Sequence, residues 1–286
     1  MKIGIGPYYL SKYPGKAGAD RMRAHGYEYL DFDWYANTEG ELYSDDEADL
    51  VARTEAWRDR FAADGYKVRQ IHGPWIFPVP NATPEEREYW FRRCSQALHA
   101  ASIIGAKYMA IHPLMPFGVG KHTPEQAKQV LEINLDFFTR LAPFGEKYGV
   151  YLCLENMPFP DLPISSVKDI VRVVREVNNP YLKVCLDTGH ANVVGPAPDA
   201  AVRIIGKDLL AILHVHGNDG LVDHHYLPHD PRDTVDWEAF SLALREIGFD
   251  GVVSLETSVK APGASPEELE RLEIALADTA KAIAGN

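Results

Sequence analysis

Short apolar runs of strand length alternate along the chain with longer helical stretches, and this alternation occurs eight times. Each run is rich in β-branched or aliphatic residues and ends in polar ones, as strands do. The runs are KIGIG (2–6), YEYLDFD (27–33), KVRQIH (67–72), YMAIHPL (108–114), VYLCLEN (150–156), LKVCLDTGH (182–190), AILHVHGND (211–219) and GVVSLETS (251–258). Strict alternation predicts parallel strands joined by right-handed helical crossovers.

Four of the intervening stretches begin with a recognisable helix start. In each, a Ser or Thr is followed three residues later by Glu or Gln, so the hydroxyl can accept from the N3 amide while the N3 side chain reaches back. The pairs are Ser44 with Glu47, Thr83 with Glu86, Thr123 with Gln126, and Ser265 with Glu268. In the last three, proline occupies the first helical position, where its missing N–H is not needed. These signatures predict four helices.

Eight strand–helix units favour an α/β fold, a single (β/α)₈ barrel that spans residues 1–286 as one domain. The alternative is a doubly wound sheet, which normally carries a phosphate-binding glycine fingerprint after its first strand. The segment GIGPYYLSKYPG (4–15) does not fit that fingerprint, and no Gly- or Ser-rich linker divides the chain. The proline-rich segments 74–84 and 158–163 follow strands, so we expect them to be loops at the barrel mouth.

Composition narrows the class of protein. Hydrophobic residues make up 46% and charged residues 24% of the 286, which is ordinary for a globular domain. No apolar run is long enough to span a bilayer and no signal-peptide pattern is present, so we expect a cytoplasmic protein without a membrane partner. The formal charge of −12 lowers the odds of a nucleic-acid partner. The cysteines, Cys94, Cys153 and Cys185, sit in apolar runs and are expected to be buried and reduced.

Residues able to bind metal stand at the end of six consecutive runs, the third to the eighth. In a (β/α)₈ barrel the carboxyl ends of the strands form the mouth that carries the active site. A single such residue is more often structural than functional, but the amino ends of the same runs carry nothing comparable. The six are His72, His112, Glu155, Asp187, His216 and Glu256. Their joint occurrence predicts a site at the mouth.

Four of these residues form the predicted metal site. Glu155, Asp187, His216 and Glu256 offer three carboxylates and one imidazole without cysteine, a set that suits Mn²⁺, Co²⁺, Mg²⁺ or Zn²⁺. His214 points to the same side as His216 because strand side chains alternate. Only His216 is expected to lie near the mouth.

Further polar and aromatic residues follow the strands. His190 lies three residues after Asp187 and can contact substrate, bind another metal or cap a helix. The Asp-x-His pair of Asp223 and His225 can place two ligands on one side of a loop, although a polar exposed loop also explains it. Trp34 and Trp75 lie in mouth loops and are predicted to stack on substrate; packing in the core is an equally good explanation for each.

With these strand-end residues the chain resembles the xylose-isomerase-like TIM barrel superfamily, which includes sugar phosphate isomerases and epimerases. The resemblance covers the third to the eighth strand in its motifs and the first two only in layout. It implies that one divalent ion is held by Glu155, Asp187, His216 and Glu256. It also implies that Glu155 and Glu256 act as the catalytic acid and base.

The same region resembles endonuclease IV, whose site holds three zinc ions. The shared features are the segment CLDTGHA (185–191), a His-x-Asn-Asp from His216, and an Asp-x-His from Asp223. This resemblance implies further ligands, namely His72, His112, His190, Asp223 and His225. The segment 32–50, however, is acidic and aromatic where a DNA-gripping loop is expected to be basic or amide-rich.

The favoured function is therefore a divalent-metal-dependent carbohydrate isomerase or epimerase. Such an enzyme abstracts a proton next to a carbonyl, stabilises the enediolate with the metal, and uses two glutamates as acid and base. The alternative is an endonuclease IV-like multi-zinc phosphoester hydrolase, which the scarcity of Lys and Arg in the candidate loops disfavours. A barrel that only binds carbohydrate gives two glutamates no purpose. The sugar, its phosphorylation and any homo-oligomer stay open.

Overall fold

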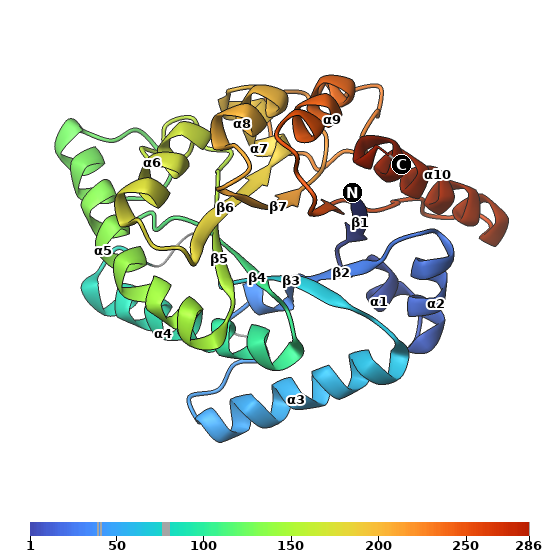
Figure 1. Ribbon diagram of the computed structural model, residues 1–286, viewed down its shortest axis with the longest axis horizontal. Coiled ribbons are helices and arrows are strands. Elements are labelled where there is room, and N and C mark those ends of the chain that lie inside the picture. Colours follow the sequence, from blue (N-terminus) through green and yellow to red (C-terminus); the bar gives the residue numbers. More distant parts are fainter. Residues whose placement is uncertain (39, 41, 76–80, 286) are drawn as a thin grey trace.

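Eight parallel strands in the computed structural model, which describes residues 1–38, 40, 42–75 and 81–285, form a nearly closed barrel (Figure 1). Their hydrogen-bonded order is β7-β6-β5-β4-β3-β2-β1-β8. The strands are β1 (Lys2–Ile5), β2 (Tyr29–Phe32), β3 (Val68–His72), β4 (Tyr108–Ile111), β5 (Tyr151–Glu155), β6 (Leu182–Asp187), β7 (Leu210–His214) and β8 (Val252–Leu255). The predicted (β/α)₈ barrel is confirmed.

The barrel closes between β7 and β8 through a single residue beyond the end of β7. The Val215 amide donates to the Ser254 carbonyl at 2.8 Å, and the Glu256 amide donates to the Val215 carbonyl at 3.0 Å. These two hydrogen bonds form an isolated parallel bridge between Val215 and Leu255, in place of the longer ladders that join the other neighbours. The residue that closes this seam between β7 and β8, Val215, therefore stands between His214 and His216 in the sequence.

Helices surround the strands in a ring (Figure 1). They are α1 (Tyr8–Lys12), α2 (Lys16–Ala24), α3 (Glu47–Asp64), α4 (Pro84–Ile104), α5 (Pro124–Tyr148), α6 (Val167–Val177), α7 (Thr188–Val194), α8 (Pro198–Ile205), α9 (Trp237–Glu246) and α10 (Pro266–Ala284), with a 3₁₀ turn η1 (Asp33–Ala36). The sixth run is shorter than the sequence suggested, because β6 stops at Asp187, whose side chain caps α7 by accepting from the His190 amide.

The helix starts agree with the sequence in three cases out of four. Thr83, Thr123 and Ser265 form the expected capping boxes. The assignment of Ser44 is wrong, because Asp46 directly precedes α3 and accepts from two amides of its first turn. Ser166 forms a further box, which the sequence did not suggest because the N3 residue is the shorter Asp169.

A separate set of buried side chains lies in the barrel interior on one half of its circumference. Ala110, Cys153, Cys185 and Ile212 form a separate buried cluster contributed by β4, β5, β6 and β7. Because strand side chains alternate, the face of β5 that carries Cys153 also carries Glu155. All three cysteines are buried and free, as expected.

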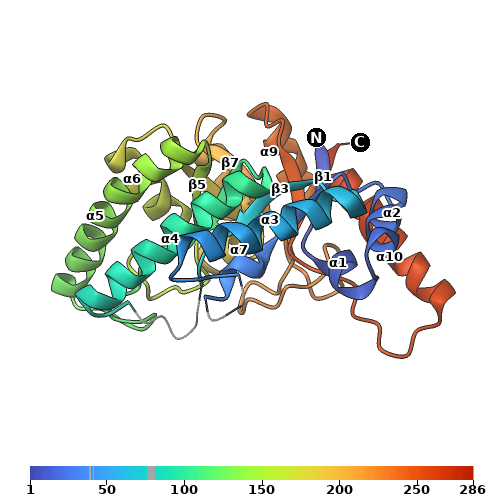
Figure 2. The same cartoon turned by 90° about the horizontal axis from the view of Figure 1, so that it is seen from below.

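The mouth lies on the side of the barrel away from the chain termini. Figure 2 shows the termini side by side at one end and the loops that follow the strands at the other. The Met1 amino group donates to the Ala284 carbonyl at 3.2 Å, which ties the two ends together. Part of the proline-rich segment 74–84, residues 76–80, lies outside the described residues. Within the described chain, no helix is long and apolar enough to cross a membrane.

Gly145 tests how tightly α5 packs on the barrel. A Cβ at this position meets the Val150 carbonyl and a methyl group of Leu152, both at 2.7 Å. We expect Gly145→Ala to lower the free energy of unfolding by about 1–3 kcal/mol, because an extra methyl in a filled space forces atoms apart. Gly120→Ala is the control, since nothing lies within 4 Å of its Cβ. Equal urea midpoints for the two variants would contradict this packing.

Candidate metal centre

Most of the predicted site residues meet at the barrel mouth. They line a cavity of about 270 Å³ there. The residues around it are Asp33, Ala36, His72, Trp75, His112, Glu155, Met157, Pro158, Phe159, His190, Asp223, His225 and Glu256. Asp187 and His216 lie beneath this lining, fully buried. In and beneath this lining, ligand-capable atoms of the described residues fall into four overlapping groups, and Glu155 belongs to three of them, one of which consists of Glu155, Cys185 and His214. The other three are described in turn.

The first group, here the β3–β4 group, contains His72, His112 and Glu155. The Glu155 Oε2 atom lies 3.5 Å from His72 Nε2 and 3.3 Å from His112 Nε2. His72 Nδ1 lies 2.8 Å from the Gly73 carbonyl, and a carbonyl only accepts, so Nδ1 carries the proton. Nε2 faces the carboxylate: in the imidazolium form it carries a proton toward Glu155, and loss of that proton leaves a lone pair that can bind a metal.

The second group, here the inner group, contains Glu155, Asp187, His214 and Glu256. His214 Nδ1 lies 2.8 Å from Glu155 Oε1 and 3.4 Å from Glu256 Oε2. The sequence analysis expected only His216 near the mouth and did not predict that His214 contacts both glutamates. The alternating His-x-His spacing carried this signal, since both rings face the barrel axis.

The third group, here the loop group, contains His190, His216, Asp223 and His225. Asp223 Oδ2 lies 3.3 Å from the Nε2 atoms of both His190 and His225. His216 Nε2 lies 3.6 Å from Asp223 Oδ1 and 3.0 Å from Asp187 Oδ2. His216 therefore joins the loop group to the inner group, and the four residues predicted as one set are divided between the two.

Backbone contacts orient the loop group. His190 Nδ1 donates to the Asn156 carbonyl at 2.7 Å, and His225 Nδ1 donates to the Glu256 carbonyl at 2.8 Å, so both rings turn Nε2 toward Asp223. Asn156, which the sequence did not single out, pairs with the backbone of Asp187 through both ends of its amide, at 2.9 and 3.0 Å.

The electrostatic environment shifts the pKa values of the three carboxyl groups of the inner group in different directions. Burial opposes the charge of Glu155, but His214, His112 and His72 hold its pKa well below the usual range. Burial likewise opposes the charge of Asp187, yet His190 and His216 lower its pKa to about 2. Burial raises the pKa of Glu256, and the charges of Asp187 and Glu155 add to that rise. The two candidate catalytic glutamates therefore have pKa values displaced in opposite directions.

The residues present fit a divalent cation. Among the described residues, four buried carboxylate oxygens lack a hydrogen-bond partner: Asp31 Oδ1 and, among the residues that line the mouth cavity, Glu155 Oε2, Asp223 Oδ1 and Glu256 Oε2. A buried acceptor left unpaired is costly, and a cation satisfies several at once. Glu155 and Glu256 share the inner group and Asp223 belongs to the loop group, so oxygen and imidazole donors surround the cavity on several sides.

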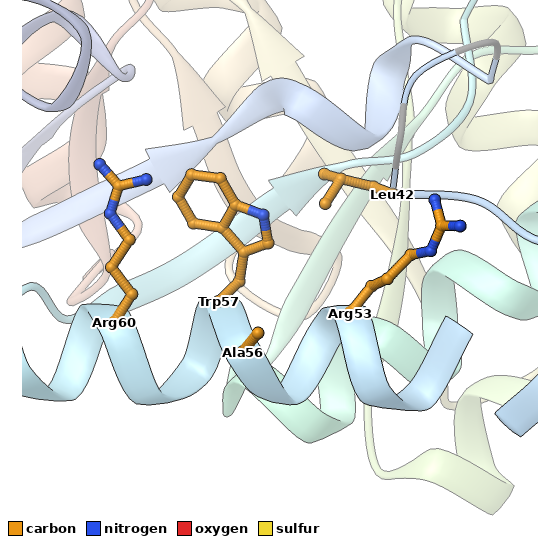
Figure 3. Close-up of a pocket in the computed structure, with 5 residues that line it drawn as sticks. All are labelled: Leu42, Arg53, Ala56, Trp57 and Arg60. Carbon is orange, nitrogen blue, oxygen red and sulfur yellow. The ribbon is translucent and has the colours of Figure 1, made fainter. Parts of the chain in front are cut away.

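The two predicted tryptophans lie in different places. Trp75 lines the mouth cavity, where its ring centroid lies 4.2 Å from that of His112. Trp34 packs between Phe32 and Trp57, with ring centroids 5.3 and 4.7 Å away, and is not among the residues around that cavity. Trp57 lines a separate groove between α3 and the segment that carries Leu42 (Figure 3). That groove contains none of the candidate ligands.

Comparisons with known proteins agree with this geometry. A family model described as "Xylose isomerase-like TIM barrel" matches residues 19–275. Inosose isomerase of Bacillus subtilis is 26% identical over 56% of this chain and 56% of its own, and a probable endonuclease 4 of Metamycoplasma arthritidis is 29% identical over 54% of each. These matches span about half of each relative's length.

Solved structures resemble almost the whole chain. D-psicose 3-epimerase with D-tagatose from Clostridium cellulolyticum has a TM-score of 0.76 at 20% identity, covering 99% of both chains. An IolI protein with a bound zinc atom has a TM-score of 0.72 at 20% identity, covering 99% of this chain and 96% of that one. At these identities the likeness concerns the fold.

The loop group predicts a pH dependence of the metal-free protein. Burial opposes the imidazolium forms, but Asp187 and Asp223 raise the pKa of His190 to about 10, and Asp223 and Glu256 raise that of His225 to about 9. This stabilisation is complete below the unfolded pKa of about 6.5 and is lost as pH rises through 9 to 10.

We therefore expect the free energy of unfolding, measured with urea and a chelator, to fall between pH 7 and 10. Asp223→Asn removes the negative charge that His190 and His225 both face, and it should flatten this fall. Asp219→Asn is the matched control in the same loop, because Asp219 accepts from the amides of Leu221 and Val222 and lies 3.4 Å from His224, which is not a member of the loop group. An unchanged slope in Asp223→Asn would contradict the assignment.

Proposed function

Since this chain belongs to the xylose isomerase-like TIM barrel family, we propose that it is a divalent-metal-dependent isomerase or epimerase of a carbohydrate or related polyol. The observation that carries the proposal is the pair Glu155 and Glu256. Both carboxylates approach the same imidazole nitrogen of His214, yet their pKa values are displaced in opposite directions. Such divergence is what acid–base exchange between two carboxyl groups requires.

The reaction that suits this pair begins with a carbon that bears a hydroxyl and lies next to a carbonyl. One glutamate takes the proton from that carbon, and the electron pair moves to the carbonyl oxygen to give an enediolate. The other glutamate returns a proton. Delivery to the opposite face of the same carbon inverts it, whereas delivery to the former carbonyl carbon exchanges ketose and aldose.

Glu155, Asp187, His216 and Glu256 are the residues that we propose hold the metal, and His214 approaches the same carboxylates. When bound, a divalent cation supplies a Lewis acid that stabilises the negative charge developing on the substrate oxygens. Mn²⁺, Co²⁺, Mg²⁺ and Zn²⁺ all accept this mixture of carboxylate and imidazole. The zinc atom bound to the structurally similar IolI protein supports the proposal that this chain binds a metal.

The substrate has room at the mouth. The mouth cavity adjoins a second cavity of about 420 Å³, because Asp33 and Glu256 line both. The second cavity is also lined by Tyr8, Lys12 and Ser258. We propose that the reacting carbons lie over Glu155 and Glu256, with Trp75 beside them, and that the rest of the polyol extends into the second cavity. His72, His112, His190, Asp223 and His225 then contact the hydroxyl groups.

A second candidate is a multi-zinc phosphoester hydrolase. It is favoured by the three adjacent groups of ligand-capable residues and by the match to endonuclease 4. In that case the β3–β4 group and the loop group hold additional ions. The mouth cavity argues against it, because the described residues around it include no Lys or Arg to bind a phosphate.

Metal content separates the two functions. We expect protein purified without added metal and analysed by inductively coupled plasma mass spectrometry to carry about one divalent ion per chain. Incubation with ketoses and ketose-like polyols should then give epimers or isomers with exchange of the carbon-bound proton for deuterium in D₂O. Close to three zinc ions per chain, with cleavage of an abasic-site duplex or another phosphodiester, would instead establish the hydrolase.

Glu256→Gln tests the acid–base role. The amide keeps the shape of the side chain but cannot take or return a proton, so kcat should fall by about 10²–10⁴-fold, with the thermal midpoint close to that of the wild type. Glu246→Gln is the control, because Glu246 forms a surface ion pair with Arg203 on the outside of the barrel. Retained turnover in Glu256→Gln removes this residue from the catalytic assignment.

A further inference from the structure

Asp31 is a buried carboxylate that no step above uses. It lies on β2, 6% exposed, and its Oδ2 atom accepts from Gln70 Nε2 at 2.6 Å and from Ser254 Oγ at 3.2 Å. The same oxygen lies 3.5 Å from His214 Nε2. Residues of β2, β3, β7 and β8 thus meet around one oxygen in the barrel interior. A buried charge held by this many strands needs a reason, because burying it is costly.

His214 connects this carboxylate to the inner group. Its ring is 1% exposed, with Nε2 directed at Asp31 and Nδ1 directed at Glu155 Oε1. The ring also lies 5.8 Å from that of His72 at 23°, nearly parallel. With both nitrogens facing carboxylates and a ring stacked on one side, the imidazole has little freedom to rotate.

The consequence falls on Glu155, whose two oxygens have different surroundings. The Oε1 atom forms a hydrogen bond with His214 Nδ1 at 2.8 Å. Oε2 has no hydrogen-bond partner among the described residues and lies within 3.5 Å of the Nε2 atoms of His72 and His112. One oxygen is therefore held by the protein, and the other is presented to the cavity.

We propose that Asp31 and His214 form a positioning pair that fixes the rotation of the Glu155 carboxylate, so that Oε2 is the oxygen offered to a bound metal, on the side of the cavity that His72 and His112 line. Asp31 acts only through His214 and touches neither metal nor substrate. Gln70 and Ser254 hold Asp31 in turn. The inference rests on the metal-binding part of the proposed function, but not on the identity of the substrate.

The test is the affinity of the metal-free protein for Zn²⁺, measured by competition with a chromophoric chelator. Asp31→Asn keeps the size of the side chain and should weaken Zn²⁺ binding by about 10–100-fold, the usual effect of removing a partner that orients a ligand. The same variant should lower kcat more than it raises KM, because the misplaced group is the reacting carboxylate. Ser254→Ala, which leaves Asp31 charged, should have a smaller effect in the same direction.

A double-mutant cycle separates positioning from general stability. If Asp31 acts through His214, then Asp31→Asn added to His214→Gln weakens Zn²⁺ binding no further than His214→Gln alone. Thr54→Val is the matched control. Thr54 is fully buried and its hydroxyl donates to the Leu50 carbonyl at 2.8 Å, but it lies on α3, outside the barrel interior. It should lower the thermal midpoint without changing Zn²⁺ affinity.

Two results would overturn the proposal: wild-type Zn²⁺ affinity in a folded Asp31→Asn protein, or additive losses in the double variant. If the wild-type protein binds no divalent metal, the proposed function fails. In that case the crystal structure of the Asp31→Asn variant tests the positioning role of Asp31 and His214. Displaced His214 and Glu155 side chains would support this role, and unmoved ones would refute it.

Discussion

The rest of the site depends on the cost of burying the carboxylate of Glu155 in the barrel interior. A charge at this depth persists only where neighbours compensate for lost water. Compensation comes from imidazoles on three other strands or their ends: His72, His112 and His214. Their number explains why the pKa of Glu155 is lowered although burial alone would raise it. Each imidazole needs an orienting partner of its own, and so the polar network spreads from one carboxylate across the barrel.

The parallel arrangement of the strands makes this concentration of charge possible. All eight strands end at the same mouth, so residues far apart in sequence, such as His72 and His214, become neighbours without any special loop. Below them, small side chains such as Ala110 and Cys153 leave room for rings above. The size of these apolar side chains therefore determines how deep in the barrel the polar side chains lie. Packing in the barrel interior and the arrangement of polar groups at the mouth depend on each other.

The barrel and the location of its site followed from the sequence, because both depend on patterns that persist along the chain: alternation of strands with helices, and polar residues at strand ends. The division of the four predicted metal ligands between the inner group and the loop group could not be predicted from the sequence. His214 contacts Glu155 because His214 lies deep in the barrel. Its depth depends on the stagger of β7 against its neighbours, which includes the register shift between Val184 and Cys185 where β6 pairs with β7. The orientation of Trp34 toward Trp57 depends on the 3₁₀ turn after β2, for which the sequence offered no signal. The metal roles stay predictions.

The bridge at Val215 has a consequence for how this protein can change over evolutionary time. Closure between β7 and β8 rests on two backbone hydrogen bonds of a residue flanked by His214 and His216, with Glu256 directly across the seam. Substitutions that retune the chemistry at these three positions also disturb the weakest junction of the sheet. New specificity is therefore more accessible at Trp75 and Lys12, which line the cavities from outside the strands, than at the residues proposed to bind metal and transfer protons.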